Sequence, residues 1–439
     1  MIRQISRLVA FSFIAALTTL PPVSKAAGSF SQAAVISTGT GNTQGTAAID
    51  SSGNSLVLWE NGSGGISCAT HPLAGPWSAP GSLSGSFPYF LQVKTSPAGN
   101  ATAVWEDGSG TGIYASDRSS KCAWSKPALV VPGVYSVTAK IWFVMDSQGD
   151  AAILWTSGTT RNFPTQINAI RRSAGGSWGS QQVVASNQWA GLDDAVLADN
   201  GDLIVAWHAF GLTCGKKFCT ESNSMLHVAR ETSGGSSFQD SGSLGPTAAS
   251  GIKVAADATG QAAVVYQTTI SGTAGTYSIV EQGAGQAWSA PQLITTASAL
   301  AIDLGTDSVG NLTVAFNIGS TVAVATGNTS SNRWSAVTTV SGADYVYGTV
   351  YGFAESSSGA AVLSWTVAAP PNVQALEVRA ISRPNASGSW TSPQTISNGS
   401  LPNGASIDSA AVNASGNGLV VYDAVDASGT VRSIYVSTF

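Results

Sequence analysis

The feature that most constrains the fold is a repeat of about 50 residues. A glycine followed six positions later by an aromatic residue forms a regular series of eight pairs, with successive pairs 46 to 59 residues apart. The residues between them form apolar stretches such as "DAAILW" and "DLIVAW", which predict strands entered through a turn. The eight pairs are Gly53/Trp59, Gly99/Trp105, Gly149/Trp155, Gly201/Trp207, Gly260/Tyr266, Gly310/Phe316, Gly359/Trp365 and Gly416/Tyr422.

A second pattern accompanies each copy. It contains an aromatic residue, usually tryptophan, with an aliphatic residue six positions later, as in "AWSKPALVV" from Ala123 and "AWSAPQLIT" from Ala287. Each unit thereby supplies four short strands joined by turns rich in glycine and serine. Four antiparallel strands in each repeat of this length are typical of a β-propeller blade.

The two ends of the chain predict how the ring closes. The last unit stops after its third strand, "SIYVSTF", and lacks the fourth. The missing strand is found at the other end, where "SFSQAAVIS" over 29–37 aligns with "SWTSPQTIS", with Phe30 and Ile36 at the aromatic and aliphatic positions. We therefore predict an all-β, eight-bladed β-propeller of four-stranded antiparallel blades, in one domain over 27–439, with the N-terminal strand completing blade eight. Each recurring aromatic would then fill the wedge between two blades, and each glycine would permit a turn with positive φ.

Residues 1–26 have the pattern of a secretory signal peptide. Arg3 and Arg7 precede an apolar run from Leu8 to Leu20, and "SKA" predicts cleavage after Ala26. Thirteen apolar residues are too few for a transmembrane segment, which needs about 20. We expect a secreted protein, whether periplasmic, extracellular or at the cell surface. In such a compartment the cysteines would form disulfides, and the sequence predicts the pairs Cys214–Cys219 and Cys68–Cys122.

The charge balance excludes one class of partner. Cleavage changes the formal net charge from −5 to −8, and the mature chain has no basic stretch. Nucleic acid is therefore not an expected partner. No cofactor motif is present, and the spacing of His71, His208 and His227 predicts no metal site.

The strings "DSSGNSLVLW", "DSQGDAAILW" and "WSAP…LS" resemble repeats of secreted bacterial β-propeller proteins distantly related to the sialidase superfamily. The resemblance implies the fold, whereas its members include hydrolases and lectin-like binders. Two features depart from sialidases. The Asp-box of that superfamily places glycine and tryptophan three positions apart, and here the interval is six. No arginine triad can be placed in the funnel, because the chain's arginines fall in or beside third strands: Arg171, Arg172, Arg230, Arg379 and Arg432.

The residue after each blade aromatic is polar in all eight copies. Three of these residues, Glu60, Glu106 and Asp423, belong to the neighbouring blades one, two and eight. Clustered carboxylates in the central funnel could act as acid and nucleophile on a glycoside, or hold Ca²⁺. The alternative is that strands ending near solvent simply end in polar residues.

Aromatic residues also gather in the loops that lead into each blade. Next to carboxylates and amides they could stack on sugar rings, or they could pack the rim. The candidate ligand-binding residues are Phe87, Tyr89, Phe90, Tyr135, Trp189, Asp193, Asp194, His208, Tyr345, Tyr347 and Tyr351. An insertion over 208–230 could contact a partner or serve only as a stapled loop.

The sequence thus predicts a binding or interaction protein, with carbohydrate as the first ligand class to test. Its partner would be a glycan or a cell-surface protein. The alternative is a sialidase-like glycoside hydrolase or lyase that uses Glu60, Glu106 or Asp423.

Overall fold

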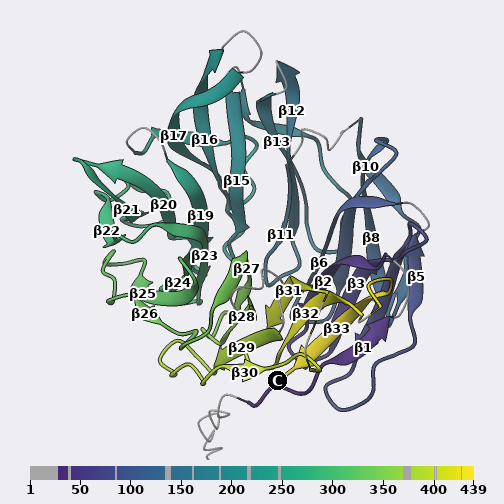
Figure 1. Cartoon of the computed structure of the whole chain (residues 1–439). Helices are drawn as coiled ribbons and strands as arrows, with labels where there is room; N and C mark the ends of the chain where they lie inside the picture. Colours follow the sequence, from purple (N-terminus) through teal and green to yellow (C-terminus); the bar gives the residue numbers. More distant parts are fainter. Residues whose placement is uncertain are drawn as a thin grey trace, which may run out of the picture.

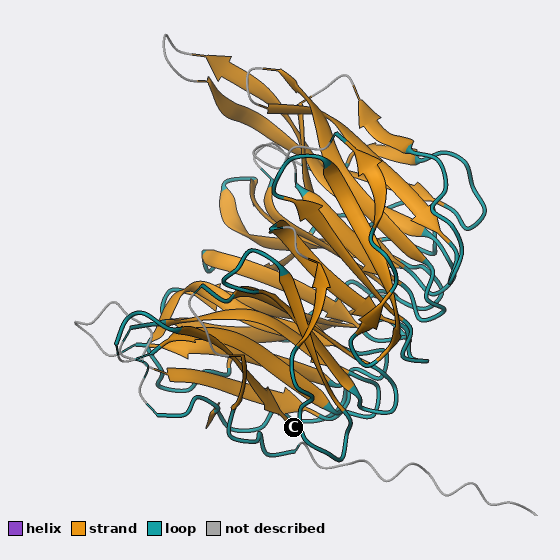
Figure 2. Cartoon of the chain, turned by 90° about the vertical axis from the view of Figure 1, so that its right-hand side faces the viewer, coloured by secondary structure: helices purple, strands orange, loops and turns teal. Residues whose placement is uncertain are grey.

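Eight antiparallel sheets surround a central axis (Figure 1), as the repeat predicts. The structure, a computed structural model, describes residues 28–439 except 38–40, 85–86, 134–139, 161–162, 187–188, 215–218, 246–248, 369–376, 400, 402 and 427. The predicted signal peptide over 1–26 and Tyr135 lie outside the described residues. All elements that the structure describes are strands joined by loops (Figure 2). Across the described ranges, no helix has the length and apolarity needed to cross a membrane.

The first four blades follow the chain in order, from the innermost strand outwards. Blade one contains β2 (Thr43–Ile49), β3 (Ser55–Glu60), β4 (Ile66–His71) and β5 (Gly81–Ser84). Blade two contains β6 (Pro88–Thr95), β7 (Ala101–Asp107), β8 (Gly112–Ser120) and β10 (Ala128–Pro132), and β9 (Ala123–Trp124) also pairs with β8. Blade three contains β11 (Ile141–Met145), β12 (Ala151–Thr160), β13 (Phe163–Arg172) and β14 (Gln182–Ser186). Blade four contains β15 (Trp189–Leu197), β16 (Leu203–Cys214), β17 (Cys219–Glu231) and β18 (Gln239–Ser243).

The remaining blades repeat this plan. Blade five contains β19 (Ser250–Ala256), β20 (Ala262–Ile270), β21 (Thr273–Val280) and β22 (Gln292–Thr295). Blade six contains β23 (Ala299–Thr306), β24 (Asn311–Ile318), β25 (Thr321–Asn328) and β26 (Thr338–Thr339). Blade seven contains β27 (Val346–Glu355), β28 (Ala361–Val367), β29 (Glu377–Arg383) and β30 (Gln394–Thr395). Blade eight contains β31 (Ala405–Val412), β32 (Gly418–Val425), β33 (Arg432–Thr438) and β1 (Ala34–Ser37).

The N-terminal strand closes the ring as predicted. β1 pairs antiparallel with β33, with Ala34 opposite Val436, and is shorter than the predicted segment 29–37. Before the strand begins, the ring of Phe30 packs on that of Phe439 with centroids 4.6 Å apart. The ends of the chain are thereby held in one sheet, and the four-residue β1 replaces the longer β33 as the outer edge of the last blade.

The recurring aromatics form the core between blades. All eight are 2% exposed or less, and each packs against the preceding blade: Trp105 of blade two, for example, joins a cluster with Leu58 and Ile66 of blade one. The same holds across the closure, where Trp59 packs on Val421 of blade eight. Burying a large aromatic contributes a few kcal/mol at about 25 cal/mol per Å², so these eight contacts hold the ring together.

The glycine turns have the predicted backbone conformation. The eight turn glycines have φ between 74° and 90°, in the left-handed region. In the first turn the carboxylate of Asp50 accepts hydrogen bonds from the backbone N–H groups of Ser52 and Asn54, which fixes the turn around Gly53. The turns also contact one another: the Asn413 side chain of blade eight donates to the carbonyl of Asp50 in blade one at 2.8 Å.

Two of the third-strand arginines join adjacent blades. Arg171 of blade three donates to the carbonyl of Gly201 and to Glu231, both of blade four. One blade further on, Arg230 donates to the equivalent carbonyl of Gly260 and to Glu281. Charge-assisted bonds of this kind fix geometry as well as adding energy. These arginines therefore act as ties between blades.

A disulfide adds a covalent tie. Cys68 in β4 of blade one is bonded to Cys122 of blade two, the pairing predicted from the sequence, with Cα atoms 6.0 Å apart. Cys214 is also disulfide-bonded, and the residue opposite it in the β16–β17 ladder is Cys219. The second bond would staple the insertion over 208–230 near its tip.

Candidate functional site

The strand order defines two faces of the propeller. Each innermost strand begins, and each second strand ends, on the face that we call the loop face. The glycine turns lie on the opposite face, which we call the turn face. Of the predicted ligand-binding residues, Phe87, Tyr89, Trp189 and Tyr345 belong to the loop face, because they lie at or next to the starts of innermost strands.

Blade four brings several of these residues together. The imidazole Nδ1 of His208 lies 2.6 Å from Oδ2 of Asp193, and the Lys140 ammonium lies 4.0 Å from the other oxygen of that carboxylate. Asp193 is the extra residue of a β-bulge in β15, between Leu192 and Asp194. Bulges redirect side chains and are common next to functional sites.

The backbone beneath the His208 ring is glycine for a steric reason. A Cβ on Gly191 would lie 2.2 Å from that ring. Gly191 is opposite His208 in the β15–β16 ladder, so the imidazole lies flat over the innermost strand. The absence of a side chain at this position lets His208 reach Asp193.

Aromatic side chains from blades two, four and seven lie on this face, and we call them the aromatic rim. Tyr89, Tyr345 and Phe87 are 52%, 47% and 45% exposed, and Trp189 is half-buried at the start of β15. Phe87 and Tyr89 contact each other edge to face, with ring centroids 5.6 Å apart. Exposed rings with nearby polar groups are suited to contact with amphipathic ligands.

Three of the other predicted aromatics cannot be assigned to this rim. Phe90 is half-buried and packs in the core between blades two and three. Tyr347 and Tyr351 are strand residues of β27, but their side chains lie outside the described set. The rim is therefore defined here by Phe87, Tyr89, Trp189 and Tyr345.

Below the loop face, charged side chains gather around the channel. Lys94, Asp194, Lys253 and Asp303 come from the innermost strands of blades two, four, five and six. The Lys253 ammonium lies 3.6 Å from the Asp303 carboxylate. Burial alone would lower the pKa of Lys253, but Asp303 and Asp194 outweigh it and raise that pKa. Lys94 still contacts water, yet the surrounding protein desolvates it and lowers its pKa despite the same two aspartates.

Asp194 is the best connected of these groups. Its carboxylate accepts a hydrogen bond from the indole of Trp142 in blade three at 2.9 Å and from the backbone N–H of Val254 in blade five at 3.0 Å. Burial nevertheless raises the pKa of Asp194. The aspartate thus joins three consecutive blades around the channel, which is an architectural role that the sequence did not suggest.

The three carboxylates proposed for catalysis are largely inaccessible. Glu60, Glu106 and Asp423 are 6%, 0% and 3% exposed. Glu60 accepts a hydrogen bond from the hydroxyl of Thr43 at 2.7 Å, within its own blade. A general acid or nucleophile must reach its substrate, and such burial leaves these side chains little access to one.

Asp423 has a carboxyl partner that sequence reasoning missed. Its side chain is hydrogen-bonded to that of Asp408, the bulge residue of β31. Oδ1 of Asp423 lies 3.0 Å from Nε of Arg432. Burial raises the pKa of Asp423 to about 6, although Arg432 favours its charged form. Burial and the neighbouring Asp423 raise the pKa of Asp408 well above its usual range.

No metal centre is indicated by the described side chains. Within those residues, no group of three or more histidine, cysteine, aspartate or glutamate side chains is arranged to hold a metal ion. The charged groups at the channel are instead paired with each other.

Comparisons with known proteins support the fold. No protein-family model matches the chain, and no curated protein matches its sequence. Among solved structures, puromycin hydrolase matches with a TM-score of 0.52 at 13% identity, over 90% of this chain and 60% of that chain. The chain thus spans about three fifths of the length of that enzyme.

Neighbours at lower structural similarity include glycan-related proteins. The NanB sialidase of Streptococcus pneumoniae matches over 91% of this chain and 93% of its own, with 10% identity and a TM-score of 0.40. The Aleuria aurantia lectin, solved with α-methyl-L-fucoside, matches over 67% of this chain and 94% of its own, with 15% identity and a TM-score of 0.39.

Proposed function

We propose that the protein is a carbohydrate-binding β-propeller that holds a glycan on its loop face. The observation that carries this proposal is that the loop face presents the aromatic rim of Phe87, Tyr89, Trp189 and Tyr345 together with the partly exposed Asp193–His208 pair of blade four. Sugars present apolar ring faces and polar edges, so a site for them combines exposed aromatic rings with a few fixed polar groups.

Burial favours binding over hydrolysis. A hydrolase or lyase that used Glu60, Glu106 or Asp423 would need those side chains in contact with substrate, and each is at most 6% exposed. The rim residues have the opposite property, because three of them expose about half of their surface. A rigid ring that presents loops from several blades offers a recognition surface without a catalytic group.

We also propose that the chain is exported. The Cys68–Cys122 disulfide supports this, because disulfides persist in oxidising compartments. Export would bring the loop face into contact with extracellular or cell-surface glycans.

The test is a glycan array with the mature chain, followed by titration of any ligand found. We expect Tyr89→Ala and Trp189→Ala to weaken binding about 3- to 10-fold each, the range for loss of one aromatic contact. Val309→Ala is the matched control, because Val309 is 73% exposed but lies in a turn of the opposite face.

Two results would contradict the proposal. One is the absence of binding to every glycan on the array, and the other is an equal loss of affinity in the Val309→Ala control. A hydrolysis assay on the same glycans separates the alternative: turnover that Asp423→Asn abolishes would identify an enzyme instead.

A further inference from the structure

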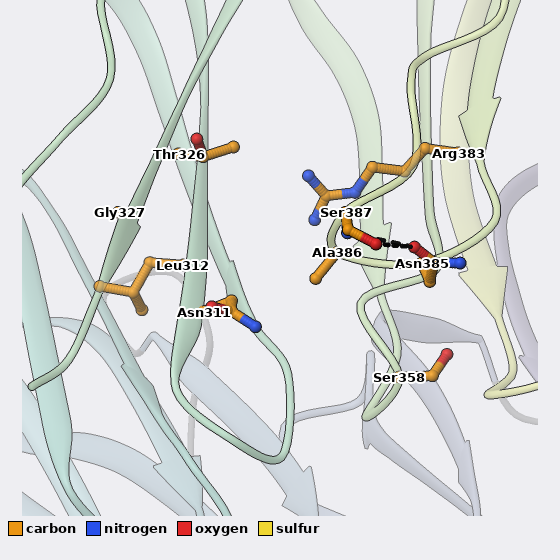
Figure 3. Close-up of a pocket in the computed structure, with 9 residues that line it drawn as sticks. All are labelled: Asn311, Leu312, Thr326, Gly327, Ser358, Arg383, Asn385, Ala386 and Ser387. Atoms are coloured by element: carbon orange, nitrogen blue, oxygen red, sulfur yellow. Dashed lines mark hydrogen bonds between the residues drawn. The ribbon is translucent and has the colours of Figure 1, made fainter.

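A pocket of about 350 Å³ lies between blades six and seven, on the side of the turn face (Figure 3). It is independent of the loop face. Its lining is rich in hydroxyl and amide groups, with one cation: Asn311, Leu312, Thr326, Gly327, Ser358, Arg383, Asn385, Ala386 and Ser387. Figure 3 shows the guanidinium of Arg383 extending across the gap toward Thr326.

Arg383 is held rigidly from one side only. Its side chain is 2% exposed, and its Nε donates to the carbonyl of Gly359 at 3.0 Å. Nη2 donates to the hydroxyl of Thr313 and to the carboxylate of Glu355. Among the described residues, Nη1 makes no hydrogen bond, and this side of the guanidinium borders the pocket. The site therefore presents a cationic N–H donor that is already fixed in position.

Another arginine of the propeller, Arg172, shows which group binds to a donor in this position. Arg172 occupies in blade three the position of Arg383 in blade seven: each is the last residue of its third strand, opposite the residue four positions before the blade tryptophan. Arg172 also contacts a threonine of the preceding blade, Thr102, as Arg383 contacts Thr313. Both arginines lie over a tryptophan, Trp178 or Trp390, in the segment that precedes the fourth strand.

The two sites differ at one decisive position. In blade two, Asp117 lies opposite Thr102 in the strand ladder. Its carboxylate accepts hydrogen bonds from Nη1 and Nη2 of Arg172, at 2.8 and 2.6 Å. In blade six, the residue opposite Thr313 is Thr326. The protein thus supplies its own carboxylate to the first arginine and a shorter, neutral side chain to the second.

We propose that the pocket between blades six and seven binds the carboxylate of a small ligand of sugar-acid size, with Arg383 Nη1 in the role that Asp117 fills for Arg172. The volume is within the range of small-molecule sites. Ser358, Ser387 and Asn311 line the same pocket and can bond the remaining hydroxyls of such a ligand.

Glu355 does not fill this role. It reaches Nη2 from the innermost strand of its own blade, where the equivalent residue of blade three is Met145. Burial raises the pKa of Glu355 to about 7, despite the neighbouring Arg383. Because Glu355 bonds Nη2, it leaves Nη1 for a ligand.

The test is ligand-observed NMR on the mature propeller with D-glucuronate, and with D-glucose as the neutral comparison. We expect glucuronate to bind and glucose not to bind. Thr326→Asp should weaken glucuronate binding at least about tenfold, because the new carboxylate would occupy Nη1 as Asp117 does in blade two. Thr326→Ser is the matched control and should bind as the wild type does.

The melting temperature provides a second readout that guards against misfolding. Thr326→Asp should raise the melting temperature, because Arg383 would gain a second carboxylate partner beside Glu355. Three results would overturn the proposal: no glucuronate binding at millimolar concentration, equal binding by glucuronate and inorganic sulfate, or binding that Tyr89→Ala removes and Thr326→Asp leaves intact. The last result would place the ligand on the loop face and would leave the proposed function standing.

Discussion

Blades four and eight lie half a ring apart and use the same two positions for different chemistry. In both, the innermost strand bulges beside the blade aromatic, and the bulge residue is an aspartate, Asp193 or Asp408. In both, its partner is the residue that follows the aromatic: His208 in blade four and Asp423 in blade eight. The repeat therefore fixes where the two side chains meet, and the residue types decide what the contact does.

The difference extends to the surroundings. The Asp193–His208 pair retains some contact with water, at 13% and 15% side-chain exposure, and its cation Lys140 is 54% exposed. In blade eight the side chain of Asp423 is 4% exposed and its cation Arg432 lies 3.0 Å away. Blade four thus resembles a site open to a ligand, whereas blade eight resembles an internal junction next to the ring closure.

The largest expected effect is on the pH dependence of the free energy of unfolding, which we expect the Asp408–Asp423 pair of blade eight to govern. Both carboxyls have raised pKa values in the folded state, so the folded protein holds their protons more tightly than the unfolded chain. The stabilising effect of the proton on Asp423 is complete below about pH 4 and is lost as the pH rises through about 6. Asp423→Asn should therefore stabilise the protein at pH 8 by up to about 3 kcal/mol, since one pKa unit corresponds to about 1.4 kcal/mol.

Urea unfolding at pH 5 and pH 8 checks this expectation. The wild type should lose stability between the two values, and Asp423→Asn should lose less. His208→Asn serves as the matched variant in blade four. If the free energy of unfolding of Asp423→Asn changed with pH as much as that of the wild type, the carboxyl pair would not govern the pH dependence of stability.

A smaller effect on the free energy of unfolding is expected when blade four is given the two carboxyls of blade eight. His208→Asp would place a second carboxylate beside Asp193, where burial is less complete and Lys140 is near. We expect a loss of about 1–2 kcal/mol at pH 8, because partial exposure screens the repulsion. The loss should become smaller at high salt, because salt screens the repulsion. A loss that is the same at low and high salt would indicate a packing defect instead of charge repulsion.

The fold could be predicted from the sequence because the same glycine–aromatic pattern recurs in each of the eight blades. The positions of Trp105 and Gly53, for example, follow from one spacing, and the closure follows from Phe30 and Ile36 near the N-terminus. These residues have local or repeated roles. Their signals remain visible without knowledge of any contact across the ring.

The site was less predictable because its contacts cross between blades. The polar residues after the aromatics were expected near solvent, yet Thr156 is buried and accepts a hydrogen bond from the backbone N–H of Lys140. Gln267 likewise donates to the carbonyl of Ala299 in the next blade. Buried main-chain groups need such partners. Lys253 and Asp408 were missed because innermost strands have no fixed motif, and only the folded ring brings their partners close.

The smallest expected effect on the free energy of unfolding comes from Lys140, the most exposed member of the group that it forms with Asp193 and His208. Its ammonium lies 4.0 Å from Asp193 and its side chain is mostly in water, so solvent screens the attraction. Lys140→Ala should reduce the free energy of unfolding by less than about 0.5 kcal/mol, measured by urea unfolding at low salt. A loss of about 2 kcal/mol would show that solvent does not screen the attraction between Lys140 and Asp193. The two blades would then differ in residue type alone, and the openness of blade four would no longer argue for a ligand there.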